Sequence, residues 1–197
     1  MVTARRDLRR RLFQVAAQQG GYFTASQAKD MGYSYQAQAH HVTVGNWLRP
    51  DRGIFRLAEW VPDVHDDLAR WTLWSRGRGV VSHETALSVH GIGELESGRV
   101  HLTVPPGFTM RHEAIVLHFA KLAKADIVPM GGFSVTTPDR SIIDVAGSTD
   151  QDQLARLIDD ARQAGLVTVR PLRARAEQVD ARAALNIERA LQQVESQ

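Results

Sequence analysis

Cysteine is absent from the 197 residues of this sequence. Without cysteine there is no disulfide framework, no thiol nucleophile and no zinc site built on thiolates. The absence fits a protein of the reducing cytoplasm, where disulfides are rare. We therefore expect a cytoplasmic protein. Because 43% of the residues are hydrophobic, we also expect it to have a packed core.

Long apolar runs are missing as well. No stretch approaches the roughly 18 apolar residues that a membrane-spanning helix requires. The charged start MVTARRDLRRRLF is not followed by the apolar segment of a secretory signal. We therefore expect no membrane partner.

The sequence also lacks the signatures of common enzyme classes. It contains no P-loop, GxSxG, HExxH, Rossmann or kinase-type motif. His83 and His90 lie seven residues apart with Glu84 between them, but this spacing is not a zinc signature. We predict no catalytic residue, no metal site and no cofactor, and the sequence favours a protein that is not an enzyme.

Charge is modest overall, at a net +2, but it is unevenly spread. Residues 1–60 carry nine Lys/Arg and four Asp/Glu, a net charge of +5. Residues 61–170 carry eleven and fourteen, a net charge of −3. A basic first segment on a slightly acidic body indicates a polyanionic partner for the first segment, although ordinary surface charge remains an alternative.

The clearest structural pattern lies in residues 24–57. A helical segment over 24–31 ends at Gly32, and a second one follows over 34–45. A turn at 50–53 then returns the chain into an apolar segment. A helix, a tight turn, a second helix and a basic hairpin predict a winged helix-turn-helix, whose second helix enters the major groove of DNA.

Candidate DNA contacts fall on three parts of this region. Arginines of a first helix, over 3–19, are placed to meet phosphates, unless they form a solvated basic face. Polar groups near the start of the second helix are suited to base edges, and the hairpin arginines to the backbone. The predicted contacts are Arg5, Arg9, Arg10, Thr24, Ser34, Tyr35, Gln36, Gln38, His40, His41, Arg49 and Arg52.

The remaining residues, 61–197, read as a mixed α/β domain. Alternating or β-branched runs predict strands at 80–81, 99–104, 114–119 and 133–136. Helical patterns lie between and after these strands, and the chain ends in a helical tail from 169. The predicted fold class is α+β, with a winged helix-turn-helix domain over 1–60 followed by a mixed α/β C-terminal domain over 61–197.

Five segments, taken in order, resemble the AbiEi-type antitoxins of bacterial abortive-infection toxin–antitoxin systems. They are residues 21–28, 52–57, 81–91, 101–105 and 135–144, which together span nearly the whole chain. Asp139 and Ser141 stand where that family usually has Glu and Thr. Both differences keep the charge or the hydroxyl group, so they cost the resemblance little.

The resemblance implies a winged helix that binds the promoter DNA of its own operon and represses it. It also implies a C-terminal domain that neutralises a nucleotidyltransferase-like toxin encoded beside it. We expect the protein itself to be a monomer or a weak dimer. The C-terminal motif residues that it points to are Ser82, His83, Glu84, Thr85, Thr137, Asp139, Arg140, Ser141 and Asp144.

Two alternative functions stay open. The protein could inactivate the toxin enzymatically, for instance by phosphorylation, with His83, Glu84, Asp139, Arg140 and Asp144 as candidate groups. The lack of a phosphate-cradling motif disfavours this reading. It could also be a plain transcription regulator whose C-terminal half senses a small molecule, although the sequence shows no clear pocket signature.

Overall fold

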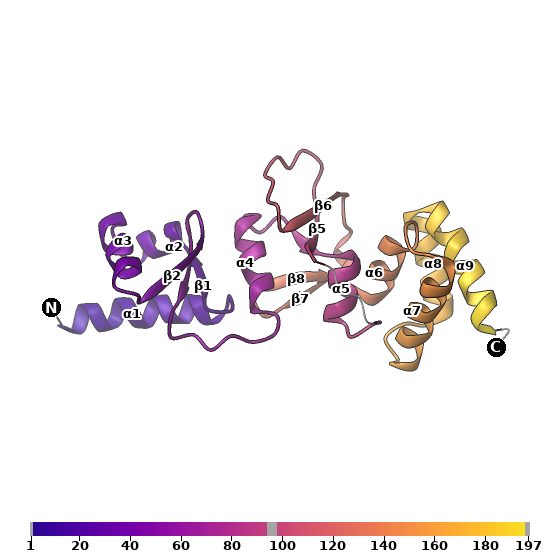
Figure 1. Ribbon diagram of the computed structural model, residues 1–197, viewed down its shortest axis with the longest axis horizontal. Coiled ribbons are helices and arrows are strands. Elements are labelled where there is room, and N and C mark those ends of the chain that lie inside the picture. The colour runs from indigo at the N-terminus through magenta and orange to yellow at the C-terminus, as the bar shows by residue number, and fades with distance from the viewer. Residues whose placement is uncertain (1, 94–97, 196–197) are drawn as a thin grey trace. The chain divides into compact units, whose positions relative to one another are not determined.

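The computed structural model describes residues 2–93 and 98–195 (Figure 1). The chain divides into two compact units. We call residues 1–79 with 129–133 the head unit, and residues 80–128 with 134–197 the body unit. None of the described helices is both long enough and apolar enough to cross a membrane.

The head unit has the predicted winged helix-turn-helix. Helix α1 (Val2–Ala17) is followed by strand β1 (Tyr22–Thr24), α2 (Ala25–Asp30) and α3 (Tyr35–Thr43). The wing consists of β2 (Trp47–Asp51) and β3 (Ile54–Leu57), and α4 (Asp66–Trp74) completes the unit. The strands form an antiparallel sheet in the order β1-β3-β2.

Side-chain caps fix where the two short helices begin. The Thr24 hydroxyl accepts the Gln27 backbone N–H, and the Gln27 side chain accepts the Thr24 N–H, which completes a capping box on α2. The Ser34 hydroxyl caps α3 in the same way by accepting the Ala37 N–H. Beneath them, Phe23 packs edge-on against Trp47 in an aromatic core, with ring centroids 4.8 Å apart.

Helix α4 is bonded to the sheet of the head unit. The Tyr22 hydroxyl donates to Asp67 Oδ1 at 2.5 Å, and Arg70 Nε donates to Asp51 Oδ2 at 2.6 Å. The Arg70–Asp51 pair is largely shielded from solvent, so water screens it less than an exposed pair. Helix α4 therefore belongs to the head unit. The predicted domain boundary after residue 60 concerns domains that fold independently, and it stays a prediction.

The body unit is built on a mixed sheet in the order β6-β5-β4-β8-β7. The strands are β4 (Val80–Val81), β5 (Val100–Val104), β6 (Ile115–Phe119), β7 (Ile127–Met130) and β8 (Phe133–Thr136), of which residues 129–133 are counted with the head unit. Strand β5 pairs with β6 in parallel and with β4 antiparallel, and β4 pairs with β8 in parallel. This sheet and the helices around it confirm the predicted mixed α/β body.

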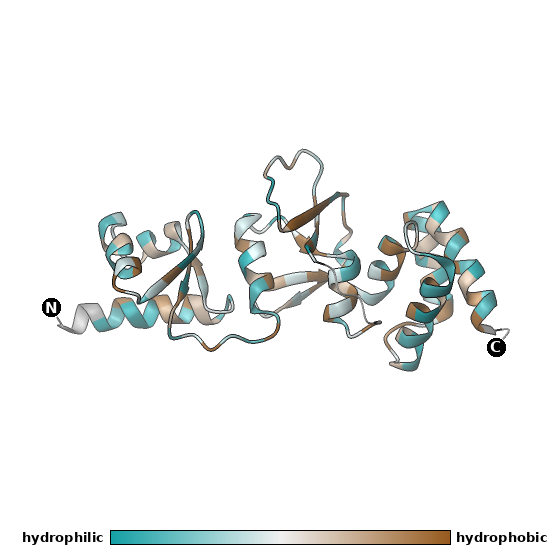
Figure 2. Cartoon of the chain, viewed as in Figure 1, coloured by the Kyte–Doolittle hydropathy of each residue, from teal (hydrophilic) through white to brown (hydrophobic). Residues whose placement is uncertain are grey.

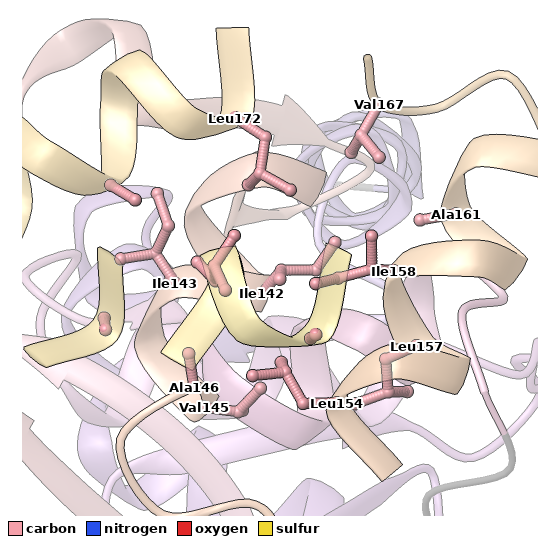
Figure 3. Close-up of a cluster of buried hydrophobic side chains, with 14 of the residues drawn as sticks. Ile142, Ile143, Val145, Ala146, Leu154, Leu157, Ile158, Ala161, Val167 and Leu172 are labelled. Atoms are coloured by element: carbon pink, nitrogen blue, oxygen red, sulfur yellow. The ribbon is translucent and has the colours of Figure 1, made fainter. Parts of the chain in front are cut away.

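Helices supply most of the body unit's core. They are α5 (His83–Val89), α6 (Pro138–Val145), α7 (Gln151–Gln163), α8 (Val169–Val179) and α9 (Ala181–Glu195), with a short 3₁₀ turn, η1, at Lys124–Asp126. Figure 3 shows Ile142, Ile158 and Leu172 converging between α6, α7 and α8, and all three are fully buried. The apolar stripes that meet here lie on amphipathic helices whose outer faces are polar (Figure 2).

Gly21 offers a test of the head unit's packing. Its φ is +80°, and an alanine Cβ there would lie 2.3 Å from Cγ of Trp60. Gly45 has a similar φ of +78° but nothing within 4 Å of such a Cβ. Left-handed backbone alone costs an alanine about 1–2 kcal/mol, so Gly45→Ala should lower the free energy of unfolding by about that amount. Gly21→Ala should lower it further, because the Trp60 ring must also move.

Urea unfolding followed by circular dichroism measures both changes. If the two variants lose the same free energy, Trp60 does not pack on Gly21 as described.

Candidate functional sites: a nucleic-acid interface and a buried charge cluster

One face of α3 is free for recognition. At 100° per residue, Tyr35, Gln36, Ala39, His40 and Thr43 lie within one arc of the helix, and all five are exposed. Tyr35 is 63% exposed. The second helix of a helix-turn-helix presents such a face to the major groove, so Tyr35, Gln36 and His40 stay predicted base contacts on an exposed face.

Gln38 corrects one of the predicted DNA contacts. It points to the opposite side of α3 and is 2% exposed. Its Nε2 donates to the carbonyl oxygens of Ala25 and Tyr33, each at 3.0 Å. The amide therefore ties α2 to α3 and is unavailable to DNA. The helical period of α3 contained this information, since position 38 lies across the helix from the exposed face.

His41 has a packing role beside the recognition face. Its ring stacks on Trp47 with centroids 4.6 Å apart, and burial lowers its pKa. His40 and His41 also line a cavity of about 840 Å³ between α1, α3 and the end of β3. Phe13 and Tyr33 supply aromatic walls to the same cavity.

The predicted phosphate contacts are mostly exposed arginines. Arg9 Nη2 donates to both carboxylate oxygens of Glu59 at 2.8 and 2.7 Å, and Arg10 pairs with Asp7 at 3.3 Å. Exposed pairs of this kind are worth about 0–1 kcal/mol, so a phosphate can compete for these guanidiniums. Arg49 and Arg52 are exposed on the wing, and Arg5 lies in α1. The hydroxyls of Thr24 and Ser34 serve as helix caps.

A polar cluster lies on one face of the body unit's sheet. The register pairs Thr103 with His118, so alternation places His101, Thr103 and His118 on one face of β5 and β6. Leu102 and Val104 face the opposite, buried side. Ser82 and His83, at the start of α5, cover the polar face.

Three histidines and a carboxylate touch one another in this cluster. The His83 and His118 rings stack with centroids 3.4 Å apart and an interplanar angle of 16°. His118 Nε2 lies 3.2 Å from His101 Nδ1, which in turn lies 2.6 Å from Glu84 Oε2. Burial lowers the pKa of His83 to about 3 and that of His118 to about 4, so the stacked rings are neutral. The hydrogen bond from His101 lowers the pKa of Glu84 to about 2.

A buried arginine network adjoins the histidines. Arg140 Nε donates to Asp144 Oδ1 at 2.7 Å, and its Nη1 donates to Asp126 Oδ2 at 3.1 Å. Arg175 adds two hydrogen bonds to Asp126, at 2.9 and 2.6 Å. Two guanidiniums therefore compensate two carboxylates, which is the condition for keeping such charges out of water.

Asp144 is the least satisfied member of the network. Its Oδ2 has no hydrogen-bond partner among the described residues and lies 3.9 Å from His83 Nδ1. Burial raises the pKa of Asp144 to about 6, against the opposing effect of Arg140. This carboxyl group can therefore take up or release a proton close to neutral pH.

The backbone of His83 is strained. Its φ is +54°, in the left-handed region that non-glycine residues rarely adopt. Such a conformation costs about 1–3 kcal/mol and persists where the surroundings enforce it, often at functional sites. The strain places the imidazole between Ser82, whose Oγ is 3.0 Å away, and His118.

The structure brings together five of the nine C-terminal motif residues: Ser82, His83, Glu84, Arg140 and Asp144. The other four serve the surrounding framework or lie apart. Thr85 Oγ1 accepts the His101 N–H, Thr137 caps α6, and Ser141 bonds Thr136 and Thr137. Asp139 stands apart, with its Oδ1 buried and without a hydrogen-bond partner in the described structure.

Sequence reasoning missed His101, His118, Asp126 and Arg175 as members of the cluster. The alternation in β5 could have marked His101, but nothing local shows which strand it meets. Within residues 2–93 and 98–195, no group of three histidine, aspartate or glutamate side chains is arranged to hold a metal ion.

A comparison with known protein families finds a match for the N-terminal region. Residues 10–58 match the family model described as "Transcriptional regulator, AbiEi antitoxin". The match covers this N-terminal segment and not the rest of the chain. The matched residues run from α1 to the end of the wing, so the resemblance to AbiEi-type antitoxins is confirmed for the part of the chain that carries α3.

The whole fold has a counterpart among solved structures. The crystal structure of the RV2827C protein from Mycobacterium tuberculosis superimposes with a TM-score of 0.61, covering 93% of this chain and 77% of that one. The sequences are 14% identical, so the likeness concerns the fold alone. No curated protein sequence matches the chain.

The pKa shifts in the cluster predict how stability depends on pH. Between about pH 4 and 6, His83 and His118 are neutral in the folded chain but protonated when unfolded, so stability falls as pH falls. Asp144 acts in the opposite direction, because in this range the folded state holds a proton that the unfolded state releases. Asp144→Asn should remove this compensation and make stability fall more steeply with acid.

Thermal unfolding of both proteins at several pH values between about 4 and 6 measures the two slopes. An equal or shallower slope in Asp144→Asn would show that Asp144 is already ionised in the native state. His118→Gln should make the slope shallower and serves as the control of opposite sign.

Proposed function

We propose that this protein is an autorepressing antitoxin: its head unit binds the promoter of its own operon, and its body unit neutralises a nucleotidyltransferase-like toxin encoded beside it. The observation that carries the proposal is the family match over residues 10–58, which contains α3 with its exposed recognition face. The net charge of +5 on residues 1–60 supports a polyanionic partner for this unit.

DNA recognition is divided between the helix and the arginines. Tyr35 and Gln36 lie near the N-terminal end of α3, the end that contacts bases in helix-turn-helix proteins. A glutamine amide can pair with an adenine edge through two hydrogen bonds. Arg49 and Arg52 on the wing, with the arginines of α1, are suited to phosphates, which add affinity without reading sequence.

Two substitutions separate these roles. Gln36→Ala should weaken binding to the promoter by about 1–3 kcal/mol, with little effect on unrelated DNA, because it removes a base contact. Arg49→Ala should weaken binding to both DNAs alike and reduce the salt slope of log K by about 1, because it removes a phosphate contact. Gln14→Ala, at an exposed glutamine of α1, is the matched control.

Fluorescence anisotropy with promoter and scrambled DNA at several salt concentrations measures all three variants. If Gln36→Ala binds the promoter like Gln14→Ala, α3 does not read bases through this residue.

Neutralisation is assigned to the cluster of Ser82, His83, Glu84, Arg140 and Asp144. The cluster joins the two body segments, 81–91 and 135–144, that resemble the antitoxin family. Its support is physical: a strained His83 and a buried, incompletely bonded Asp144 are features that a purely structural core does not need.

The variant His83→Asn tests this assignment. Asparagine tolerates left-handed backbone, so the variant should fold with a thermal midpoint close to that of the wild type. It should fail to restore growth when co-expressed with the toxin, because the imidazole is gone. His112→Asn, at a body-unit histidine outside the cluster, should restore growth fully.

Two outcomes contradict the proposal. Full rescue of growth by His83→Asn would show that the cluster takes no part in neutralising the toxin. Promoter binding by the wild-type protein without any rescue would indicate a plain regulator whose C-terminal half senses a small molecule.

A second candidate function, enzymatic inactivation of the toxin, is favoured by Asp144. A carboxyl group with a pKa of about 6 beside His83 can act as an acid or a base near neutral pH. Incubating the protein with the toxin and labelled ATP tests phosphorylation directly. Label transfer that is lost in Asp144→Asn would support it, and neutralisation without transfer would exclude it.

A further inference from the structure

The cavity of the head unit has walls that are largely apolar and aromatic. Its volume is about 840 Å³, within the range of about 300–1,000 Å³ that is usual for small-molecule sites. Leu12, Tyr33 and Trp47 line it, and all three are buried. Phe13 lines it from α1 and is 46% exposed. A flat apolar molecule in this cavity would remove the Phe13 ring from water, which favours binding.

The Tyr33 hydroxyl is a polar group without a partner in this cavity. Tyr33 is 9% exposed, and none of the described residues forms a hydrogen bond with its hydroxyl. Burial raises the pKa of Tyr33, so the hydroxyl keeps its proton at neutral pH and can donate. Buried polar groups almost always have a partner, so this hydroxyl indicates an acceptor that comes from outside the chain.

A positive charge lies beside the hydroxyl. Arg9 also lines the cavity, and its charge opposes the effect of burial on the pKa of Tyr33, so the two groups are close. Arg9 Nη2 donates to both oxygens of Glu59, while Nε and Nη1 make no hydrogen bond within the described parts of the chain. The Glu59 side chain is 55% exposed, so water and salt screen its repulsion of a second anion. A hydroxyl donor beside a guanidinium is suited to a carboxylate.

We propose that this cavity binds a planar aromatic carboxylate. Its ring lies against the aromatic walls, and its carboxylate accepts hydrogen bonds from the Tyr33 hydroxyl and from Arg9. Ring burial and stacking hold the apolar part, and charge-assisted hydrogen bonds hold the anionic part. An aliphatic acid lacks the flat face and a neutral aromatic molecule lacks the charge, so both should bind more weakly. The site does not depend on toxin neutralisation.

Binding at this site should also affect DNA. Two residues that line the cavity are predicted DNA contacts: His40 lies on the exposed face of α3, and Arg9 is a predicted phosphate contact. A carboxylate on Arg9 uses donors that a phosphate needs, so the aromatic acid and the promoter each lower the affinity of the protein for the other. This consequence rests on the proposed DNA-binding function, whereas the cavity site itself does not.

The anion 2-naphthoate is a suitable probe, because it combines two fused rings with one carboxylate. NMR titration of the isotope-labelled full chain measures its dissociation constant, and amide signals of residues that line the cavity should shift while those of α9 stay in place. Tyr33→Phe keeps the ring that packs on Trp47 and should weaken binding about tenfold, because it removes a hydrogen bond to a charged group. Tyr35→Phe, at an exposed tyrosine of α3, is the matched control and should leave this constant unchanged.

The neutral amide 2-naphthamide tests the charge, since it has the same rings, and it should bind at least tenfold more weakly than 2-naphthoate. Three outcomes overturn the site: no shift of the cavity signals, equal binding of the amide, or unchanged binding to Tyr33→Phe. In the last case the hydroxyl would serve water alone.

Fluorescence anisotropy with promoter DNA tests the competition. Saturating 2-naphthoate should weaken promoter binding about fivefold or more, and the same concentration of acetate is the control for ionic strength. If 2-naphthoate binds but leaves promoter binding unchanged, the competition is wrong. If the wild-type chain does not bind the promoter at all, the proposed DNA-binding function fails, and the NMR titration still decides whether the site exists.

Discussion

The buried guanidinium of Arg140 is the contact on which the body unit's arrangement depends. It holds Asp144 on its own helix and Asp126 from the segment before β7, while Arg175 of α8 secures Asp126 from another side. Removing one partner from a buried ion network leaves a charge without compensation, at a cost of about 3–5 kcal/mol. The segment before β7, helix α6 and helix α8 are therefore held together by one charge-balanced group.

In the head unit, the main requirement is that the short helix α3 be held firmly enough to present its side chains. Helix α3 has nine residues, too few to be stable alone. The Ser34 cap fixes its beginning, Gln38 bonds it to α2 and His41 packs it on Trp47. Polar residues thus hold the helix from one side, which leaves the other side free for recognition.

Much of the head unit was predictable because its signals are local. Thr24 with Gln27, Ser34 and the turn at Gly53 mark element boundaries over a few residues. Gln38 was misassigned because residue type was weighed without the helical period.

The buried cluster was only half predictable. The two motif segments named His83, Arg140 and Asp144, but their meeting depends on strand pairing across the sheet. His118 joins through the β5–β6 register, and Arg175 reaches Asp126 across 49 residues. No local pattern encodes a contact of that span.

The parallel pairing of β5 and β6 has a consequence for how the chain assembles. The two strands are neighbours in sequence, so closing their ladder costs little loop entropy. Strand β4 can pair with β5 early, but its other edge pairs with β8 only after Val135 has been made. During synthesis the β4–β6 part of the sheet leaves the ribosome before the strand and helix that complete it. Until β8 arrives, the edge of β4 that pairs with it has no partner strand, and unpaired strand edges of this kind are what chaperones protect during synthesis.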